Sequence, residues 1–318
     1  MFSTEIVNEE GFDKIILKDT ASKTFVEIFP SCGGILHGFH VLHNGQWINV
    51  IDHYEDAGDF KNNVTSKGFK SCKLSPFACR ISNAHYNFGE KEYTIEKFLL
   101  GKNAIHGLLY DVPFNIVKQS ASEEHASISL EYSYRGEDKG YPFLYDCLLH
   151  YKLEKDNLLN ITTEIINRDK GLIPLQDGWH PYFTFGSKID DLQLEFQANE
   201  ILLCNEGIIP SGELLPFHEF DAIKKIGSAI FDDCFALNFA ECQPLVVLRD
   251  RVKKIQLELR PGKQYPYLQI YTPEHRNSIA LENLSAAPDA FNNKMGLIIL
   301  EPEEKIIFAT SYKLTSLT

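Results

Sequence analysis

Hydrophobic and polar residues alternate with a period of two along most of this chain. The pattern is uninterrupted over residues 126–134 (ASISLEYSY), and it recurs at residues 160–165, 192–196 and 255–259. Successive side chains of a β-strand point to opposite faces of a sheet, so this alternation is typical of strands with one buried face. The same segments are rich in Val, Ile, Thr, Tyr and Phe, which favour strands. The sequence therefore predicts a fold built mainly from β-strands.

Few segments favour a helix. Only residues 221–230 and 288–293 are predicted to be helical, and both helices would be short. Turn signals such as His43-Asn44-Gly45 and Pro261-Gly262 recur at short intervals between the apolar segments. The same signals predict five further strands, at residues 93–98, 145–153, 245–248, 267–271 and 306–312.

Nothing in the composition divides the 318 residues into parts. The chain has no linker rich in Gly, Ser and Pro, and it has no repeat of fixed period. Many strands in one undivided chain favour a large antiparallel β-sandwich, in which one sheet packs against another. We therefore expect an all-β fold with few short helices, formed by a single domain over residues 1–318.

The charge balance excludes some classes of partner. The chain has 31 Lys and Arg against 44 Asp and Glu, a net charge of −13. Such a field repels polyanions, and the basic stretch at residues 249–254 is short and reads as a solvated strand edge. Apolar runs such as residues 296–300 are far too short to span a bilayer. We expect neither nucleic acid nor a membrane as a partner.

The cysteines and the first residues bear on the compartment. The seven cysteines are odd in number and form no C-x-x-C pair, which indicates buried reduced thiols rather than a disulfide framework. The residues MFSTE at the start have neither the basic region nor the apolar stretch of a secretory signal. A cytoplasmic protein is therefore expected.

Two histidines are candidates for proton transfer. His106, in NAIHG, stands at a tight turn beside a glycine that would let its imidazole enter a cleft; the alternative is a surface histidine. His180, in GWHPYF, is flanked by Trp179, Tyr182 and Phe183, whose rings can pack on the apolar faces of a sugar. Desolvation there would lower its pKa. The alternative is a core histidine that is bonded to a backbone carbonyl.

Three charged residues interrupt apolar segments. Glu282 ends an apolar strand and would point either into a pocket or into solvent. Asp232 begins an acidic pair between aromatic residues, for which an Asx turn is the alternative. Arg80 stands in the apolar run PFACRI, where its burial would require a carboxylate partner or a polar ligand.

In order and spacing these stretches resemble the aldose 1-epimerase (galactose mutarotase-like) family over nearly the whole chain. Its histidine-glycine turn resembles residues 103–107, its H-P-Y-F stretch is intact at 180–183, and its glutamate strand with P-D-A and Asn resembles 281–292. Arg80 before Ile81 and the stretch 232–235 also match. The chain departs from the family pattern at Cys79, Leu108, Asp233, Asn283 and Leu284, which concern the pocket wall more than the proton-transfer groups.

The resemblance implies a supersandwich that interconverts the α and β anomers of a free aldose through ring opening, with no metal or other cofactor. It makes Glu282 the base and His180 the acid, and His106 would help to polarise the ring oxygen. The substrate-binding residues would be Arg80, Asp232, Asn103, Trp179 and Tyr182. The expected partner is a small-molecule sugar, and the protein would be a monomer or homodimer. His37, His40 and His43 recur every third residue, but in a strand this spacing alternates faces and disfavours a metal site.

Two other functions stay open. A hexose-6-phosphate 1-epimerase shares this fold, but a phosphate calls for basic residues, and such relatives typically carry an arginine just after the histidine-glycine turn. This chain has Leu108, Leu109 and Tyr110 there. A noncatalytic sugar-binding module would keep the aromatic residues and lose the acid or the base, whereas both Glu282 and His180 are present.

Overall fold

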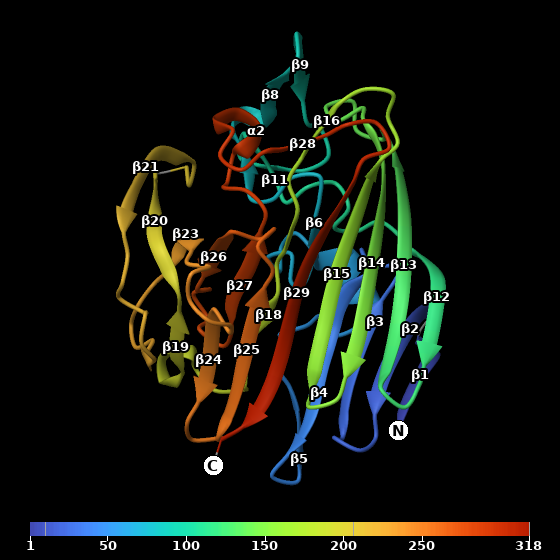
Figure 1. The fold of residues 1–318 in the computed structure, drawn as a ribbon, viewed down its shortest axis with the longest axis vertical. Coiled ribbons are helices and arrows are strands. Elements are labelled where there is room, and N and C mark those ends of the chain that lie inside the picture. The colour runs from blue at the N-terminus through green and yellow to red at the C-terminus, as the bar shows by residue number, and fades with distance from the viewer. Residues whose placement is uncertain (10, 206, 318) are drawn as a thin grey trace.

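The computed structural model describes residues 1–9, 11–205 and 207–317. The predicted domain also includes residues 10, 206 and 318, which lie outside the described residues. The described strands pair antiparallel throughout, and they form two layers of sheet (Figure 1). The prediction of an all-β sandwich with few short helices is therefore confirmed.

One layer is a nine-stranded sheet. Alternation predicted its long strands correctly: along β15, every second residue is buried. In sheet order its strands are β12 (Asn115–Ala121), β13 (His125–Arg135), β14 (Leu144–Glu154), β15 (Leu158–Asn167), β29 (Lys305–Ser316), β25 (Ile255–Pro261), β24 (Val246–Asp250), β19 (Gln193–Phe196) and β22 (Lys224–Lys225).

A five-stranded sheet packs on one half of the nine-stranded sheet. Its β2 contacts β13 and β14, and its β1 contacts β12 (Figure 1). In order its strands are β1 (Phe2–Glu9), β2 (Phe12–Asp19), β3 (Thr24–Phe29), β4 (Ile35–His43) and β5 (Gln46–Asn49).

An eight-stranded sheet packs on the other half. The ring of Phe183 in this sheet meets that of Tyr312 in β29, and Phe235 meets Phe196 of β19, so an aromatic core joins the two sheets. In order its strands are β21 (Pro210–Pro216), β20 (Ala198–Cys204), β23 (Asp232–Leu237), β26 (Tyr267–Tyr271), β27 (Ile279–Leu284), β17 (Gly178–Trp179) and β6 (Lys73–Leu74), with β18 (Tyr182–Phe183) also paired to β27.

Smaller elements cover one end of this sheet. A three-stranded sheet has the order β10 (Leu99–Leu100), β11 (Asn103–Ile105) and β7 (Arg80–Ile81), and the remaining pairs are β8 (His85–Phe88) with β9 (Lys91–Thr94) and β16 (Ile173–Leu175) with β28 (Ile298–Leu300). The helices are α1 (Ala57–Asn63), α2 (Ala290–Asn293) and two 3₁₀ turns, Ser82–Ala84 and Ile189–Asp191. None of the helices in the described residues has the length and hydrophobicity to cross a membrane.

Three local predictions were wrong in whole or in part. Residues 221–230 form no helix, because Lys224 and Lys225 form the edge strand β22 beside β19, and the N–H groups of Ile226 and Gly227 donate to the carbonyls of Leu192 and Asp190. The predicted strand 93–98 stops at Thr94, since the next N–H groups donate to Ala84 and to the carboxylate of Asp138. Helix α1, capped by the side chain of the preceding Asp, was missed. The second predicted helix is present as α2.

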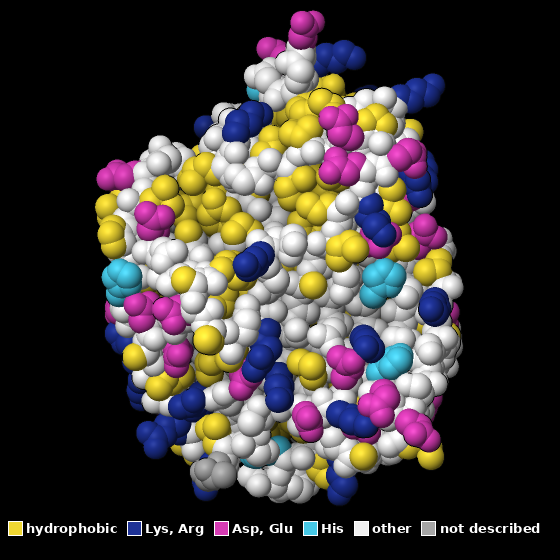
Figure 2. Space-filling view, viewed as in Figure 1, with side chains coloured by type: hydrophobic (Ala, Val, Ile, Leu, Met, Phe, Trp, Pro, Cys, Tyr) yellow, Lys and Arg dark blue, Asp and Glu magenta, His cyan; other side chains and the backbone are white. Residues whose placement is uncertain are grey.

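The cysteines and surface charges largely follow expectation. All seven cysteines are free and five are buried, but Cys204 is half-buried and Cys242 is exposed, so burial was wrongly predicted for Cys242. The basic stretch 249–254 forms the end of β24 and the turn into β25. Figure 2 shows acidic and basic side chains interspersed over this face, with no basic stripe.

Candidate active site

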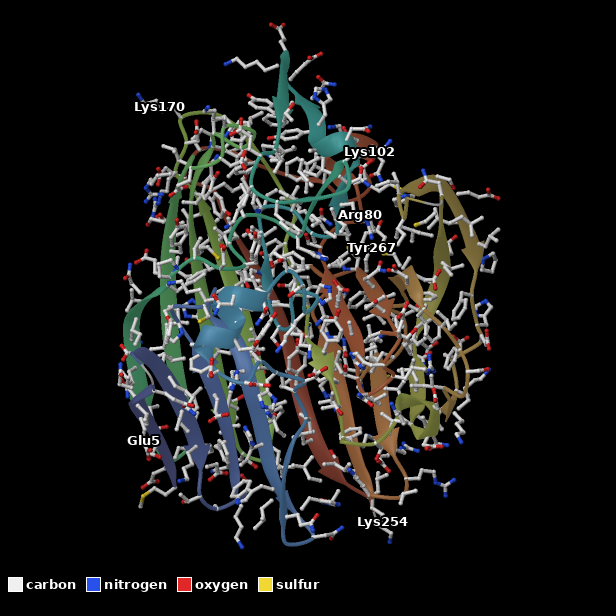
Figure 3. All side chains as sticks on the ribbon, turned by 180° about the vertical axis from the view of Figure 1, so that it is seen from behind. Glu5, Arg80, Lys102, Lys170, Lys254 and Tyr267 are labelled. Atoms are coloured by element: carbon white, nitrogen blue, oxygen red, sulfur yellow. The ribbon has the colours of Figure 1, made fainter. Side chains whose placement is uncertain are left out.

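A cavity of about 230 Å³ lies over the eight-stranded sheet, on the side away from the nine-stranded sheet. Side chains from β27, β26 and β23 form its floor, and the small sheet β10-β11-β7 and residues 65–69 form its walls. Figure 3 shows Arg80 on this side of the molecule. Six predicted residues line the cavity, and they come from five separate parts of the chain: Arg80, His106, His180 with Tyr182, Asp232 and Glu282.

Strand alternation directs Glu282 into the cavity. Every residue of β27 is buried, since the strand is paired on both sides and covered on both faces. The next residue, Asn283, donates from Nδ2 to Oγ1 of Thr310 in β29 at 2.8 Å, so its side chain faces the nine-stranded sheet. Adjacent residues of a strand point to opposite faces. Glu282 therefore faces the cavity, where it is 2% exposed.

His180 meets Glu282 from the loop between β17 and β18. Its Nε2 lies 3.3 Å from Oε1 of Glu282. The backbone of His180 is held on both sides, because its N–H donates to Cys72 and its carbonyl accepts from the N–H of Ser71. Its ring stacks on Tyr182 with centroids 5.1 Å apart. The imidazole is thus fixed with one nitrogen on the carboxylate, not on a backbone carbonyl.

His106 completes the buried polar cluster. Its ring meets that of His180 edge-on, with centroids 4.7 Å apart, and it is 8% exposed, which excludes the surface alternative. The predicted tight turn is present, with positive φ at His106 and at Gly107. A Cβ on Gly107 would lie 2.5 Å from the carbonyl oxygen of Ser75, so only glycine fits there.

Burial favours the neutral forms of these groups. It lowers the pKa of His180 to about 4, and together with the charges of His180 and Arg80 it lowers the pKa of His106 well below its usual value. Burial also raises the pKa of Glu282 well above 4.5; the nearby Asp232 adds to this increase and Arg80 opposes it. Burial therefore disfavours both a charged imidazole and a charged carboxylate.

Several polar atoms of the cluster have no partner within the described chain. They are Oε2 of Glu282, Nδ1 of His180, Nδ1 of His106 and Oε1 of Gln269. Buried polar atoms are rarely left unpaired, because each lost hydrogen bond costs about 1–3 kcal/mol. A ligand rich in hydroxyl groups can satisfy donors and acceptors together, so the cavity is suited to a sugar.

Arg80 and Asp232 stand at the sides of the cavity. Asp232 lies in β23 rather than in an Asx turn, and its Oδ1 accepts a hydrogen bond from Nε2 of Gln269 at 3.0 Å. Arg80 is half-buried, and it forms no ion pair with any residue in the described ranges. Asp289 holds its strand in place: the Asp289 N–H donates to the Arg80 carbonyl, and its carboxylate accepts from the N–H of Ser82. An arginine in an apolar run requires either a carboxylate partner or a polar ligand, and the surroundings of Arg80 favour the polar ligand.

The comparisons with known proteins agree with this geometry. The family model for aldose 1-epimerases matches residues 16–313. The chain belongs to the aldose 1-epimerase family. A maltose epimerase from Levilactobacillus brevis is 21% identical to it over 97% of this chain and 96% of that protein.

Solved structures show the same fold. A galactose mutarotase-like protein from Clostridium acetobutylicum has a TM-score of 0.87 at 18% identity, covering 100% of this chain and 99% of that one. A galactose 1-epimerase from Lactobacillus acidophilus has a TM-score of 0.83 at 21% identity, with both chains covered completely. The prediction of family and fold is confirmed.

The sequence predicted that three further side chains would contact a sugar, but they lie outside the cavity: Trp179, Phe183 and Asn103. Trp179 is 3% exposed and packs against Tyr151 and the ammonium group of Lys73, outside the cavity. Phe183 is completely buried in the core between the sheets. Both follow from strand alternation, which leaves only Tyr182 in the cavity wall. Asn103 also lies outside the cavity, where its Oδ1 accepts from the N–H of Asn83.

Sequence reasoning missed several wall residues of the epimerase fold. Gln269 lies directly opposite Glu282 in β26, and Tyr271 follows on the same face. A polar Gln within YLQIY was the available signal. Phe69 contacts His106 through its ring, with centroids 4.7 Å apart, and Phe98 and Leu100 complete the apolar wall. No motif in the sequence pointed to these residues.

The three regularly spaced histidines of β4 have separate surroundings. His37 packs against Phe29 and His53, whereas His40 contacts the carboxylate of Glu27 at 2.9 Å. His43 contacts the carbonyl of Lys253. Within the described ranges, no group of three or more His, Cys, Asp or Glu side chains is arranged to hold a metal ion.

Proposed function

We propose that this protein interconverts the α and β anomers of a free aldose by general acid–base catalysis. The observation that carries the proposal is the contact of 3.3 Å between Nε2 of His180 and Oε1 of Glu282, with the second oxygen of the carboxylate unpaired in a buried cavity. Two proton-transfer groups of different chemistry at one point are the minimum that ring opening of a hemiacetal requires.

The reaction needs one base and one acid. Glu282 takes the proton from the C1 hydroxyl while His180 gives a proton to the ring oxygen. The bond between C1 and the ring oxygen breaks, and its electron pair goes to that oxygen as the C1 carbonyl forms. Rotation about the C1–C2 bond presents the other carbonyl face, and the same proton transfers in reverse close the ring. His106 lies beside His180 and would bind the substrate at the ring oxygen.

The two roles require an ionised Glu282 and a protonated His180. Burial disfavours both charged forms, although opposite charges on groups 3.3 Å apart stabilise each other. A bound sugar offsets this, because its hydroxyl groups donate to the unpaired carboxylate oxygen and favour the charged form. Arg80 acts in the same direction through its charge. Substrate binding is therefore expected to create the ionised base.

A neutral sugar fits the cavity better than a sugar phosphate. Arg80 is the only Lys or Arg among the described residues that line it. Leu108 and Leu109, which follow the histidine-glycine turn, are buried in the hydrophobic core and offer nothing to a phosphate. A dianion would have a single cationic partner and would also meet the unfavourable field of a chain with net charge −13.

The test is an anomerisation assay. Freshly dissolved α-glucose and α-galactose are followed by polarimetry with the purified protein and with the Glu282→Gln variant. Acceleration that the variant loses supports the proposal. Saturable sugar binding without acceleration would support the noncatalytic binding module instead.

We also propose that the protein acts in the cytoplasm, since seven free cysteines suit a reducing compartment. The monomeric or homodimeric state stays a prediction.

A further inference from the structure

Asp52 joins three segments of the chain that meet beside the cavity. Its backbone N–H donates to the carbonyl of Tyr182 at 2.9 Å. One oxygen of its carboxylate accepts from Nζ of Lys70 and the other accepts from Oγ of Ser278, both at 2.6 Å. Asp52 does not line the cavity itself, so the proposed reaction leaves these bonds without a role.

The partners of this carboxylate lead to the wall and to the floor of the cavity. Lys70 directly follows the wall segment, residues 65–69. Ser278 is completely buried and directly precedes β27, the strand of Glu282. Figure 1 shows β27 beside β18, to which it is paired. The carboxylate therefore ties a wall of the cavity to its floor.

The floor is the fixed end of this connection. β27 is hydrogen-bonded to β26 on one side and to β17 and β18 on the other, so Ser278 at its start is firmly placed. The wall segment belongs to no helix or strand. The carboxylate of Asp52 therefore holds the wall segment in place, and β27 holds the carboxylate.

The backbone of the wall segment requires an external hold. φ is +79° at Gly68, +56° at Phe69 and +58° at Ser71, so three of four consecutive residues are left-handed. For a residue other than glycine this conformation is strained, and it persists only where neighbouring groups enforce it. Lys70 stands inside this run, so its ion pair is placed to enforce the conformation.

The wall segment in turn fixes two rings of the cavity. The ring of Phe69 meets that of His106, with centroids 4.7 Å apart. Gly68 lies against the hydroxyl of Tyr182, because a Cβ added to this glycine would lie 2.8 Å from that oxygen. The ring of Tyr182 stacks on His180. A shift of the wall segment would therefore disturb the rings that contact both histidines.

We propose that Asp52 is a positioning residue that holds the wall segment against the bound sugar through Lys70. The inference rests on the proposed function and adds to it a residue that acts from outside the cavity. Loss of the bond displaces Phe69 and its neighbours, whereas β27 keeps Glu282 in place. The loss should therefore weaken sugar binding and leave the proton transfers intact.

The first experiment measures KM and kcat for the anomerisation of glucose in two test variants, Asp52→Asn and Lys70→Met. Each should raise KM about fivefold, the value of roughly one hydrogen bond, with kcat within about twofold of the wild-type value. KM does not depend on the fraction of the protein that is folded, so partial misfolding does not imitate this result. Because the two side chains act through one bond, the double variant should raise KM no further than either test variant alone.

Glu27→Gln and Lys14→Met are the matched controls. Lys14 pairs with Glu27 at 3.2 Å, and the two side chains are 16% and 14% exposed, against 15% and 21% for Lys70 and Asp52. The control pair lies on β2 and β3, outside the cavity. The controls should lower the melting temperature about as much as the test variants do and should leave KM unchanged.

Hydrogen exchange tests the same contact without reference to activity. In both test variants the N–H groups of Phe69, Ser71 and Cys72 should exchange faster than in the wild-type protein, because their bonds hold the turn that follows the wall segment. In the two controls the exchange of these groups should be unchanged. Unchanged exchange in the test variants contradicts the proposal.

The kinetic outcomes separate the positioning role from the proposed function. If the wild-type protein accelerates anomerisation and KM is unchanged in both test variants, the positioning role is overturned and the proposed function stands. KM effects that multiply in the double variant also overturn it, because the two side chains would then act separately. If the wild-type protein accelerates no anomerisation, both are overturned.

Discussion

Asp177 accepts a hydrogen bond from the ammonium group of Lys73 at 2.5 Å, and both side chains are completely buried. The same carboxylate oxygen accepts from the hydroxyl of Tyr265 at 2.7 Å, and Lys73 also donates to the carbonyl of Gly178 at 3.1 Å. These bonds join β6 to β17 immediately before His180, the acid of the proposed reaction. The ion pair therefore holds β17 in place, and with it the adjoining backbone that carries the His180 imidazole.

Asp177→Asn should strongly destabilise the protein. It leaves the charge of Lys73 buried without a counter-charge, which costs about 3–5 kcal/mol in comparable buried pairs. Urea unfolding measures the change in the free energy of unfolding. Glu124→Gln breaks the exposed pair with Lys155 and serves as the control, which should change stability far less. If both variants lowered the free energy of unfolding equally, burial would not make the Lys73–Asp177 pair more important for stability than an exposed pair.

Glu282→Gln should lower kcat by about 10²-fold or more and, at the same time, raise the melting temperature at neutral pH. The folded-state pKa of Glu282 is raised, so the folded state holds its proton more tightly than the unfolded state. Stability therefore falls as pH rises above 4.5 toward the folded pKa, and glutamine removes this loss. Calorimetry at several pH values measures the change in melting temperature. Glu164→Gln, in β15 of the nine-stranded sheet, is the control. Near wild-type turnover would transfer the base role to another group, with Asp232 the next candidate.

The pH dependence of kcat/KM tests the roles of acid and base. For the free enzyme, kcat/KM reports the pKa of the essential groups before binding. If Glu282 is the base, kcat/KM rises with pH above 4.5 as the carboxylate ionises through its raised pKa. The rise in kcat should come at lower pH, because sugar hydroxyls favour the ionised form. A kcat/KM that falls over this range would assign the acid role to Glu282 and the base role to His180.

Arg80→Lys should raise KM by roughly three- to tenfold, the value of about one lost hydrogen bond, because the planar donor fork is lost. The melting temperature should change little, since Arg80 has no ion-pair partner among the described residues. Arg135→Lys, at an exposed arginine paired with Asp146, should leave KM unchanged. A lower melting temperature with an unchanged KM would make Arg80 a structural residue.

Gly107→Ala should damage the site through the backbone. Gly107 has φ of +78° and its added Cβ would meet backbone atoms of Ser75 at 2.5 Å and 2.7 Å. Gly45 is the matched control, because it has φ of +80° and nothing within 4 Å of the same Cβ. Gly45→Ala should lose only the conformational cost of a left-handed residue, about 1–2 kcal/mol. If Gly107→Ala lost no more stability than Gly45→Ala and kept normal turnover, the close approach of residue 107 to the Ser75 backbone would be contradicted.

The sequence by itself determined the architecture and singled out the two residues that we propose for proton transfer. Alternation is a local property: along segments such as residues 126–134 it fixes which side chains are buried, whatever the rest of the chain does. Glu282 and His180 stood out for the same reason, since each places a titratable group inside an apolar segment where only function or pairing offsets its burial.

Tertiary structure decided what surrounds that pair. The sequence favours Trp179 and Tyr182 equally as stacking surfaces for a sugar. Only the pairing of β17 and β18 with their neighbours decides which of the two rings faces the cavity. Gln269 enters the wall because register sets it opposite Glu282, and Lys73 meets Asp177 through the pairing of β6 with β17. Register and packing between distant segments are non-local, so no local pattern contains them. The same reason places Asn103 outside the cavity.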